Sequence, residues 1–349
     1  MRACRDGVNV VIWAFAHLEA DAASGALRVR PTFDVGAVRA TQRRIERALR
    51  DDAAAAAARP RRVAHLVAFG GWNGPHPDAA AAGGRAWFRA WDEWNAGACG
   101  GAFDGVDWDL EGHDDPAAPT ASLRAPTLAL VADFSRAAKA AGYAVGLAPA
   151  ESYLDGASPL YSEALNLPPL APWDDGGGAS RGADGGGGDE RPPGGAAAFP
   201  YAGRNAYAPI LAAAGVETFD FVSVQLYEGY SRACHALTRD GTAAGAYVAA
   251  LAARLARGWR VELPGGATTL RVPPERLVVG LANGWADGAK FVRVDAAALR
   301  DVPRGALRGF MFWVIDEEGA TPEGGTAPLY FARELSAALR GDDPPAPEL

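Results

Sequence analysis

Residues 103–112 read FDGVDWDLEG, a short strand-like segment with an acidic side chain at every second position from Asp107 to Glu111. Successive side chains of a strand point to opposite faces, so Asp107, Asp109 and Glu111 share one face and the apolar residues between them share the other. The segment therefore predicts a strand whose apolar face packs on helices. Its acidic face then points into a barrel or into the crevice of an open sheet.

The spacing of these three carboxyl groups has a chemical consequence. Neighbours on one strand face lie about 7 Å apart, so ionising all three groups costs free energy through repulsion between like charges. We therefore expect the groups to share protons and at least one pKa to rise. A carboxyl group that stays protonated near neutral pH can act as a general acid. Glu111 stands last, at the carboxyl end of the strand, where barrel enzymes build their sites. We therefore predict that Asp107, Asp109 and Glu111 form a row of catalytic acids, the acid row.

Two other interpretations of the row are a solvated edge strand and a metal-binding loop. An exposed edge would not carry large apolar residues on its other face. A calcium loop of the EF-hand type requires a glycine at its sixth position and a glutamate at its twelfth, and neither falls in place. A magnesium site stays open at this point.

The rest of the chain alternates short apolar runs with helical stretches. This alternation predicts a parallel sheet, and seven strands fit either a barrel or a doubly wound sheet. The absence of a glycine-rich nucleotide fingerprint after any strand disfavours the doubly wound form. The strand runs are 8–16, 63–69, 103–109, 143–148, 219–227, 277–282 and 308–315, and the helical stretches are about 34–58, 124–141, 242–257 and 329–340.

No linker divides the 349 residues, so we expect a single catalytic barrel domain over 1–349. The glycine-rich and aspartate-rich segment at about 174–198 has almost nothing to bury and predicts a disordered insertion within that domain. Residues 344–349 predict a frayed tail.

Composition excludes several classes of partner. A net charge of −8 argues against nucleic acid and anionic membranes as partners. No apolar run approaches the roughly 18 residues of a membrane span, and no signal-peptide pattern is visible. Three cysteines are too few for a disulfide framework or a zinc site. The oligomeric state stays open.

At the acid row the chain resembles glycoside hydrolase family 18, the chitinase family, whose signature D-x-x-D-x-D-x-E is complete here as Asp104, Asp107, Asp109 and Glu111. Other segments resemble the family's strands in the same order. They are VIWAFA (11–16), HLVAFGGWN (65–73), VGLAP (145–149), VQLYE (224–228) and GFMFW (309–313). The resemblance spans about residues 8–340 and implies a TIM (β/α)8-type barrel.

The chain departs from the family pattern at three places. Ala68 stands where the family's S-x-G-G motif has serine, and Glu228 stands where Q-x-Y-N has Asn or Asp. The family's first strand has no counterpart ahead of Val8. The resemblance therefore predicts a barrel whose first strand is lacking or incomplete, with two open strand edges that favour association or poor expression.

The resemblance also implies a mechanism, a retaining and substrate-assisted glycoside hydrolysis. In it Glu111 protonates the leaving glycosidic oxygen, and the N-acetyl group of the sugar attacks the anomeric carbon. Asp109 orients the acetamido N–H, Asp107 shares a proton with Asp109, and Tyr227 binds the acetamido oxygen. The mechanism requires no metal and no cofactor.

The remaining site residues bind sugar in this interpretation. Trp313 forms an apolar floor, Gln225 shares a strand face with Tyr227, and Phe15 and Trp72 contribute aromatic surface. Each tryptophan has a structural alternative, because a tryptophan at a strand end is more often core and Trp72 equally fits loop packing.

The implied partner is chitin or an N-acetylglucosamine oligosaccharide, met outside the cell. Two rival functions use the same fold. One is a glycan-binding lectin without activity, which usually lacks one of the acids. The other is an endo-β-N-acetylglucosaminidase that acts on N-glycans.

Overall fold

The computed structural model describes residues 2–51, 62–112, 120–165, 205–228, 231–286, 291–322, 325 and 327–342. The predicted insertion at 174–198 and the predicted tail at 344–349 lie outside these residues.

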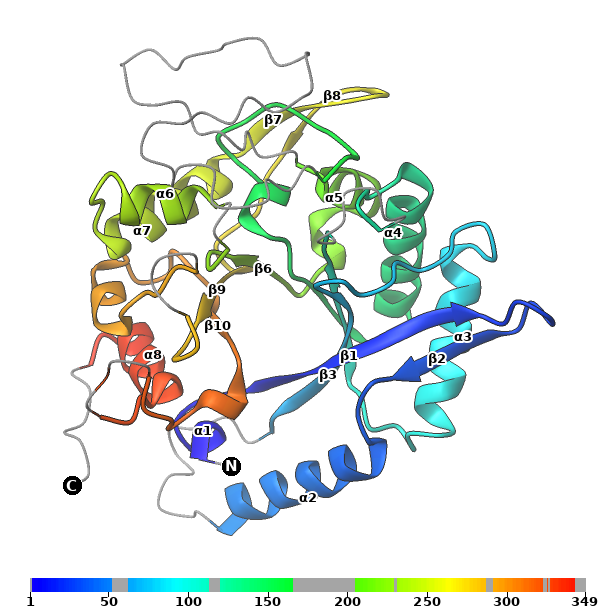
Figure 1. Cartoon of the computed structure of the whole chain (residues 1–349), viewed down its shortest axis with the longest axis horizontal. Coiled ribbons are helices and arrows are strands. Elements are labelled where there is room, and N and C mark those ends of the chain that lie inside the picture. The colour runs from blue at the N-terminus through cyan, green and yellow to red at the C-terminus, as the bar shows by residue number, and fades with distance from the viewer. Residues whose placement is uncertain are drawn as a thin grey trace.

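A curved sheet forms the centre of the molecule (Figure 1). Its strand order is β10-β9-β6-β5-β4-β3-β1-β2. Seven of these strands run parallel, and β2 pairs antiparallel with β1. The strands are β1 (Val10–Ala20), β2 (Leu27–Pro31), β3 (Ala64–Gly71), β4 (Gly105–Leu110), β5 (Ala144–Leu147), β6 (Phe221–Gln225), β9 (Leu277–Ala282) and β10 (Gly309–Trp313).

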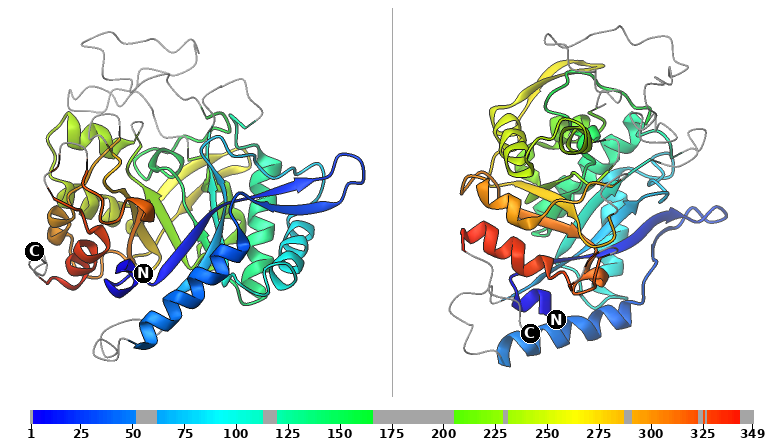
Figure 2. Two further views of the ribbon diagram at one scale, coloured as in Figure 1. Left: turned by 60° about the horizontal axis from the view of Figure 1, so that its bottom comes forward. Right: turned by 60° about the vertical axis from the view of Figure 1, so that its left-hand side comes forward.

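Each of the seven apolar runs in the sequence forms one of the seven parallel strands, as predicted. Two hairpins were not expected. The first joins the long end of β1 to β2 and projects from the body of the molecule (Figures 1 and 2). The second consists of β7 (Trp259–Leu263) and β8 (Gly266–Leu270). Both are two-stranded ribbons with many exposed residues, so neither shows the continuous apolar run of a buried parallel strand.

The first and last parallel strands approach each other through their side chains. Among the described residues, β10 pairs with β9 alone, and no hydrogen-bonded ladder joins it to β1. The rings of Phe15 on β1 and Trp313 on β10 stack with their centroids 5.7 Å apart. The sheet therefore curls far enough to bring the carboxyl ends of its outer parallel strands into contact.

Helices cover the outer face of the sheet (Figure 2). Helices α3 and α4 pack beside each other over β3 to β5. The α-helices are α1 (Arg2–Arg5), α2 (Val35–Asp51), α3 (Gly84–Ala96), α4 (Ala125–Ala140), α5 (Ala208–Ala214), α6 (Arg232–Thr238), α7 (Ala244–Arg257) and α8 (Phe331–Arg340). The short 3-10 helices are η2 (Glu151–Tyr153), η3 (Val216–Thr218), η4 (Ala296–Asp301) and η5 (Ile315–Glu317). Within the described ranges, none of the helices is both long and apolar enough to cross a membrane.

The apolar face of β4 is anchored in an aromatic core. The ring of Trp108 lies 5.1 Å from Phe69 of β3 and 5.0 Å from Phe134 of α4, centroid to centroid. Its indole N–H donates to the Ser135 hydroxyl at 3.0 Å. Aromatic pairs of this kind add stability beyond the area they bury. The strand that carries the acid row is thus fixed from behind.

The approach to β4 is held by Asn95 near the end of α3. The Asn95 side chain is buried; its amide group donates to the Phe103 carbonyl at 2.9 Å and accepts from the Phe103 N–H at 3.1 Å. Because both backbone groups of Phe103 depend on one side chain, Asn95 fixes where the segment leading into β4 begins.

We predict that Asn95→Leu lowers the free energy of unfolding by about 1–3 kcal/mol, because it leaves buried backbone groups of Phe103 without partners. Urea denaturation measures this change. Arg89→Ala, at an exposed position of the same helix, should change the value by less than about 0.5 kcal/mol. Equal stability of the two variants would contradict this role of Asn95.

Candidate active site

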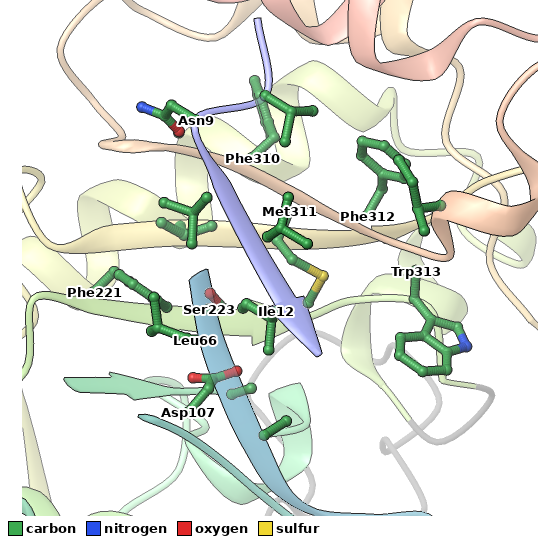
Figure 3. A pocket seen from close by; sticks show the side chains of 18 of the residues that line it. Asn9, Ile12, Leu66, Asp107, Phe221, Ser223, Phe310, Met311, Phe312 and Trp313 are labelled. Atoms are coloured by element: carbon green, nitrogen blue, oxygen red, sulfur yellow. The ribbon is translucent and has the colours of Figure 1, made fainter. Parts of the chain in front are cut away.

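A cavity of about 460 Å³ opens on the inner face of the sheet (Figure 3). Most of its wall is apolar and comes from β1, β3, β10 and α8. Its polar groups come chiefly from β4 and β6, and Figure 3 shows Asp107 directed into the cavity near Leu66 and Ser223. Asp107 and Asp109, two of the three carboxyl groups predicted to share the inner face, therefore line this cavity.

Six of the eight predicted site residues line this cavity: Phe15, Asp107, Asp109, Gln225, Tyr227 and Trp313. The other two, Glu111 and Trp72, are not part of its wall. Glu111 directly follows the end of β4 and is half-buried. Trp72 directly follows β3, and 43% of its surface is exposed. Asp104 lies at the opposite end of β4, where it accepts from the His65 N–H at 2.9 Å and braces β4 against β3.

The backbone around Glu111 is held by two residues that the sequence patterns did not single out. The hydroxyl of Tyr207, buried just ahead of α5, accepts from the Leu110 N–H at 2.6 Å and donates to the Leu110 carbonyl at 2.8 Å. The Nε2 atom of His76 lies 2.8 Å from the Glu111 carbonyl oxygen. Neither residue belongs to a local motif, because each reaches β4 from a distant part of the chain.

Asp107 is the most deeply buried acid of the row, with 3% of its surface exposed. Its Oδ1 atom has no hydrogen-bond partner among the described residues. Its neighbour across the ladder on β3 is Ala68, which offers only a methyl group. Burial, and then the charge of Asp109, raise the pKa of Asp107 to about 8. A neutral carboxyl group is therefore the favoured form at neutral pH.

Asp109 and Gln225 form the polar contact between β4 and β6. The amide nitrogen of Gln225 donates to Asp109 Oδ1 at 2.6 Å and to the Ala148 carbonyl at 2.7 Å. Burial raises the pKa of Asp109 to about 7, and the hydrogen bond from Gln225 opposes this shift. Gln225 thus fixes the orientation of the middle carboxyl group.

The surroundings of Glu111 and Tyr227 raise the pKa values of both groups and so favour their neutral forms. Desolvation by the surrounding protein, followed by the charges of Asp109 and Glu228, raises the pKa of Glu111. Desolvation and then the nearby acids also raise the pKa of Tyr227. At neutral pH the arrangement therefore offers a carboxyl group and a phenol that can both donate protons or hydrogen bonds.

Two glycines make room for the site. A Cβ atom on Gly146 of β5 would lie 2.2 Å from Asp107 Oδ1 and 2.5 Å from the ring of Phe221. A Cβ atom on Gly71, which has a φ of +84°, would lie 2.6 Å from the ring of Phe15. Only glycine fits at these positions without displacing a side chain that lines the cavity.

An aromatic rim borders the cavity at the ends of β1 and β10. Trp313 is 37% exposed and stacks on Phe15. Trp285, which the sequence analysis did not select, donates from its indole N–H to the Trp313 carbonyl at 2.5 Å, and its ring meets Tyr227 edge-on at 5.9 Å. In the sequence, the only feature that could have identified Trp285 is its position as a tryptophan shortly after the buried strand β9. An exposed tryptophan beside a cavity lined by carboxyl groups suits the apolar face of a sugar ring.

The architecture is similar to that of solved chitinases. A family GH18 chitinase from Chromobacterium violaceum superposes with a TM-score of 0.55 and 18% identity, over 96% of this chain and 78% of that chain. A GH18 chitinase from Pseudoalteromonas aurantia gives 0.46 and 13%, over 95% of this chain and 92% of that chain. No family model matches the sequence, and no curated protein matches it either. The likeness to the Chromobacterium structure shows the fold, and the predicted TIM-type barrel fold is confirmed.

We predict that stability falls as the pH rises from about 5 to 8. The folded-state pKa of Asp107 is about 8, above that of an aspartate in the unfolded chain, about 3.9. The folded protein therefore binds more protons in this interval, so raising the pH favours unfolding. Asp107→Asn should flatten the dependence, and Glu93→Gln, on the exposed side of α3, should not. Urea denaturation at several pH values measures it; parallel curves for wild type and Asp107→Asn would contradict a buried, protonated Asp107.

We predict that Gly146→Ala lowers the free energy of unfolding by about 1–3 kcal/mol, because the new methyl group overlaps Asp107 and Phe221. Gly309→Ala is the matched control, because a Cβ atom on this β10 glycine meets nothing within 4 Å. Thermal melts of the two variants compare the positions. A Gly146→Ala protein as stable as the control would contradict this prediction, because it would show that the space beside Asp107 and Phe221 accommodates a methyl group.

Proposed function

We propose that this protein is a family 18 glycoside hydrolase that cleaves β-1,4-linked N-acetylglucosamine polymers by a retaining, substrate-assisted mechanism with Glu111 as the general acid. The observation that carries the proposal is the acid row at the carboxyl end of β4. Its groups have raised pKa values, and Gln225 and Tyr227 stand beside it.

Glu111 has the properties that a proton donor to a glycosidic oxygen requires. Its raised pKa favours the protonated carboxyl group, and its backbone is fixed through Leu110 and His76. The proton moves to the leaving oxygen as the glycosidic bond breaks. The carboxylate that results can then take a proton from the water that attacks next.

The sugar supplies its own nucleophile in this mechanism. The oxygen of its N-acetyl group attacks the anomeric carbon and gives a cyclic, positively charged intermediate. Asp109, oriented by Gln225, stabilises this charge and accepts a hydrogen bond from the acetamido N–H. Tyr227, held in its neutral form, donates to the acetamido oxygen. Asp107 is the neighbour with which Asp109 shares a proton.

The aromatic side chains position the sugar. Trp313 presents an exposed face and is supported from below by Phe15 and through its carbonyl by Trp285. A sugar whose apolar face rests on Trp313 stands at the end of the sheet where the acid row also ends. Trp72, exposed on the loop that follows β3, is the second tryptophan expected to bind sugar.

The shared fold also supports the proposal, because the Chromobacterium protein with the same fold is named a chitinase. A fold alone does not decide function. The rival lectin function would leave sugar binding intact without turnover, and the N-glycan endoglycosidase function would change the substrate but retain the acid row.

We predict that the protein converts N-acetylated chitin oligosaccharides to shorter oligomers and that Glu111→Gln slows this reaction on the order of 10²–10⁴-fold, because glutamine cannot donate the proton. Chromatography of the products gives the rate, and calorimetry gives the affinity. Binding of the oligomer should be nearly unchanged in the variant.

Asp104→Asn is the matched control, because Asp104 belongs to the same motif but braces the opposite end of β4; this variant should keep most of the activity. Hydrolysis of N-glycoproteins alone would assign the endoglycosidase function. Binding without hydrolysis by the wild type would assign the lectin. A Glu111→Gln variant with more than about a tenth of the wild-type rate would exclude Glu111 as the acid.

A further inference from the structure

Glu151 is a buried acid that lies outside the acid row and has no role in the proposed mechanism. It begins η2 in the segment 148–155 that follows β5, and only 1% of its surface is exposed. One of its carboxyl oxygens accepts from the Ala233 N–H at 2.8 Å, and the other accepts from the Tyr247 hydroxyl. Glu151 therefore joins the segment after β5 to the first turn of α6 and to α7.

The segment after β5 is a firm support because it stays paired with β6. Gln225 of β6 donates its backbone N–H to the Pro149 carbonyl at 2.9 Å and its side-chain amide to the Ala148 carbonyl at 2.7 Å. Ala150 and Gln225 also form a parallel β-bridge. Glu151 thus projects from backbone that is bonded to the end of β6.

The first residues of α6 are held by side chains that precede the helix. The Cys234 N–H donates to the Ser231 hydroxyl at 2.9 Å, which caps the helix. The Arg232 guanidinium donates to Asp155 at 2.7 Å, and Asp155 is a buried carboxyl group of the segment after β5. Because the first N–H groups of a helix have no partner within it, these bonds and the one to Ala233 fix where α6 begins.

Ser231 links the start of α6 to the residues around Tyr227. Its hydroxyl donates to the Leu226 carbonyl at 3.1 Å, and its backbone N–H donates to the Glu228 carbonyl at 3.1 Å. The residues on both sides of Tyr227 are therefore bonded to one serine, which is fully buried. A displacement of Ser231 would move the backbone that carries the phenol.

The phenol of Tyr227 depends on this backbone for its alignment. The Tyr227 carbonyl accepts from the Val292 N–H at 3.0 Å, and the ring meets Trp285 edge-on with the centroids 5.9 Å apart. The ring lines the cavity. A small rotation of the backbone moves the hydroxyl at the far end of the ring most, and a hydrogen bond weakens steeply when it is misaligned.

We propose that Glu151 and Ser231 are positioning residues for Tyr227: through the start of α6 they hold the turn after β6, so that the phenol stays aligned with the acetamido oxygen of the sugar. The inference rests on the proposed function. Neither residue belongs to the described wall of the cavity, so both act through the backbone of the turn. The alternative is a purely stabilising role, in which they support α6 and α7 without an effect on Tyr227.

The first test is the steady-state rate on a chitin oligosaccharide. Ser231→Ala and Glu151→Ala should each lower kcat about tenfold or more and change KM less than about threefold, because alignment of the attacking oxygen governs the chemical step more than binding. Glu151→Gln should restore most of the rate, since an amide can accept from the Ala233 N–H and donate to the Tyr247 oxygen.

Thr238→Ala is the matched control, because it removes a hydroxyl bond to the Cys234 carbonyl at the far end of the same helix. This variant should keep the wild-type kcat within about twofold. A loss in Thr238→Ala as large as in Ser231→Ala would overturn the proposal. Ser231→Cys, which keeps the volume and weakens both hydroxyl bonds, takes the place of Ser231→Ala if the alanine variant does not fold.

A double-mutant comparison separates positioning from stabilisation. Tyr227→Phe lacks the hydroxyl whose alignment is at stake, so adding Ser231→Ala to this protein should lower kcat further by no more than about twofold. A further loss as large as that in the wild-type background would overturn the proposal.

The last test needs no turnover and uses ¹⁹F NMR of protein labelled with 3-fluorotyrosine. The Tyr227 signal, identified by its absence from Tyr227→Phe, should shift in Ser231→Ala and in Glu151→Ala and stay in place in Thr238→Ala. An unchanged Tyr227 signal in both alanine variants would overturn the proposal. Shifted signals in variants of a wild-type protein that hydrolyses nothing would overturn the proposed function and keep the positioning of Tyr227.

Discussion

The burial of a row of carboxyl groups on one face of β4 is the constraint on which the rest of the site depends. Moving an ionised carboxylate out of water costs several kcal/mol in a protein, and no basic side chain is hydrogen-bonded to Asp107 or Asp109 in the described part of the chain. The groups respond by keeping protons, which gives Asp107 a pKa of about 8 and Asp109 one of about 7. Because these buried carboxyl groups stay protonated, they can donate protons at neutral pH.

A strand with such a face stays in place only if its other face is held firmly. Trp108 packs between Phe69 and Phe134, and Asn95 fixes the segment that leads into the strand. At its carboxyl end, Tyr207 satisfies both backbone groups of Leu110. These contacts come from β3, α3, α4 and the segment ahead of α5. The aromatic core on one face of β4 therefore fixes the position of the acid row on the other face. Overpacking at Gly146 acts directly on the acid row for the same reason.

The sequence predicts the parts of this arrangement that depend on local periodicity. The alternation within 103–112 indicates which residues of β4 face inward. Continuous apolar runs identify the seven parallel strands, five of which (β3, β4, β5, β6 and β9) are almost entirely buried. The alternation of side chains along the strand that begins at Phe221 also places Gln225 and Tyr227 on one face, and both line the cavity. The family resemblance, carried by spaced acids, leads to the fold that the structure has.

The parts that the sequence does not predict depend on contacts between distant segments. Tyr207 and Trp285 lie in turns and His76 lies in a loop, all without periodicity, and each contacts a residue far from it in the chain. Glu111 and Glu228 affect each other's pKa because β4 and β6 end at the same edge of the sheet, although β5 lies between them. The hairpin of β1 and β2 is exposed on its outer side, so hydrophobic patterning gives it no distinct signal.

The central claim is that the acid row donates a proton while the substrate supplies the nucleophile. The most direct measurement is the anomeric form of the first product, followed by ¹H NMR immediately after the enzyme is mixed with an N-acetylated chitin oligosaccharide. Two displacements at the same carbon retain configuration, so the β-anomer should appear first and convert slowly to the equilibrium mixture. Initial release of the α-anomer would show a single displacement by water and would contradict the account.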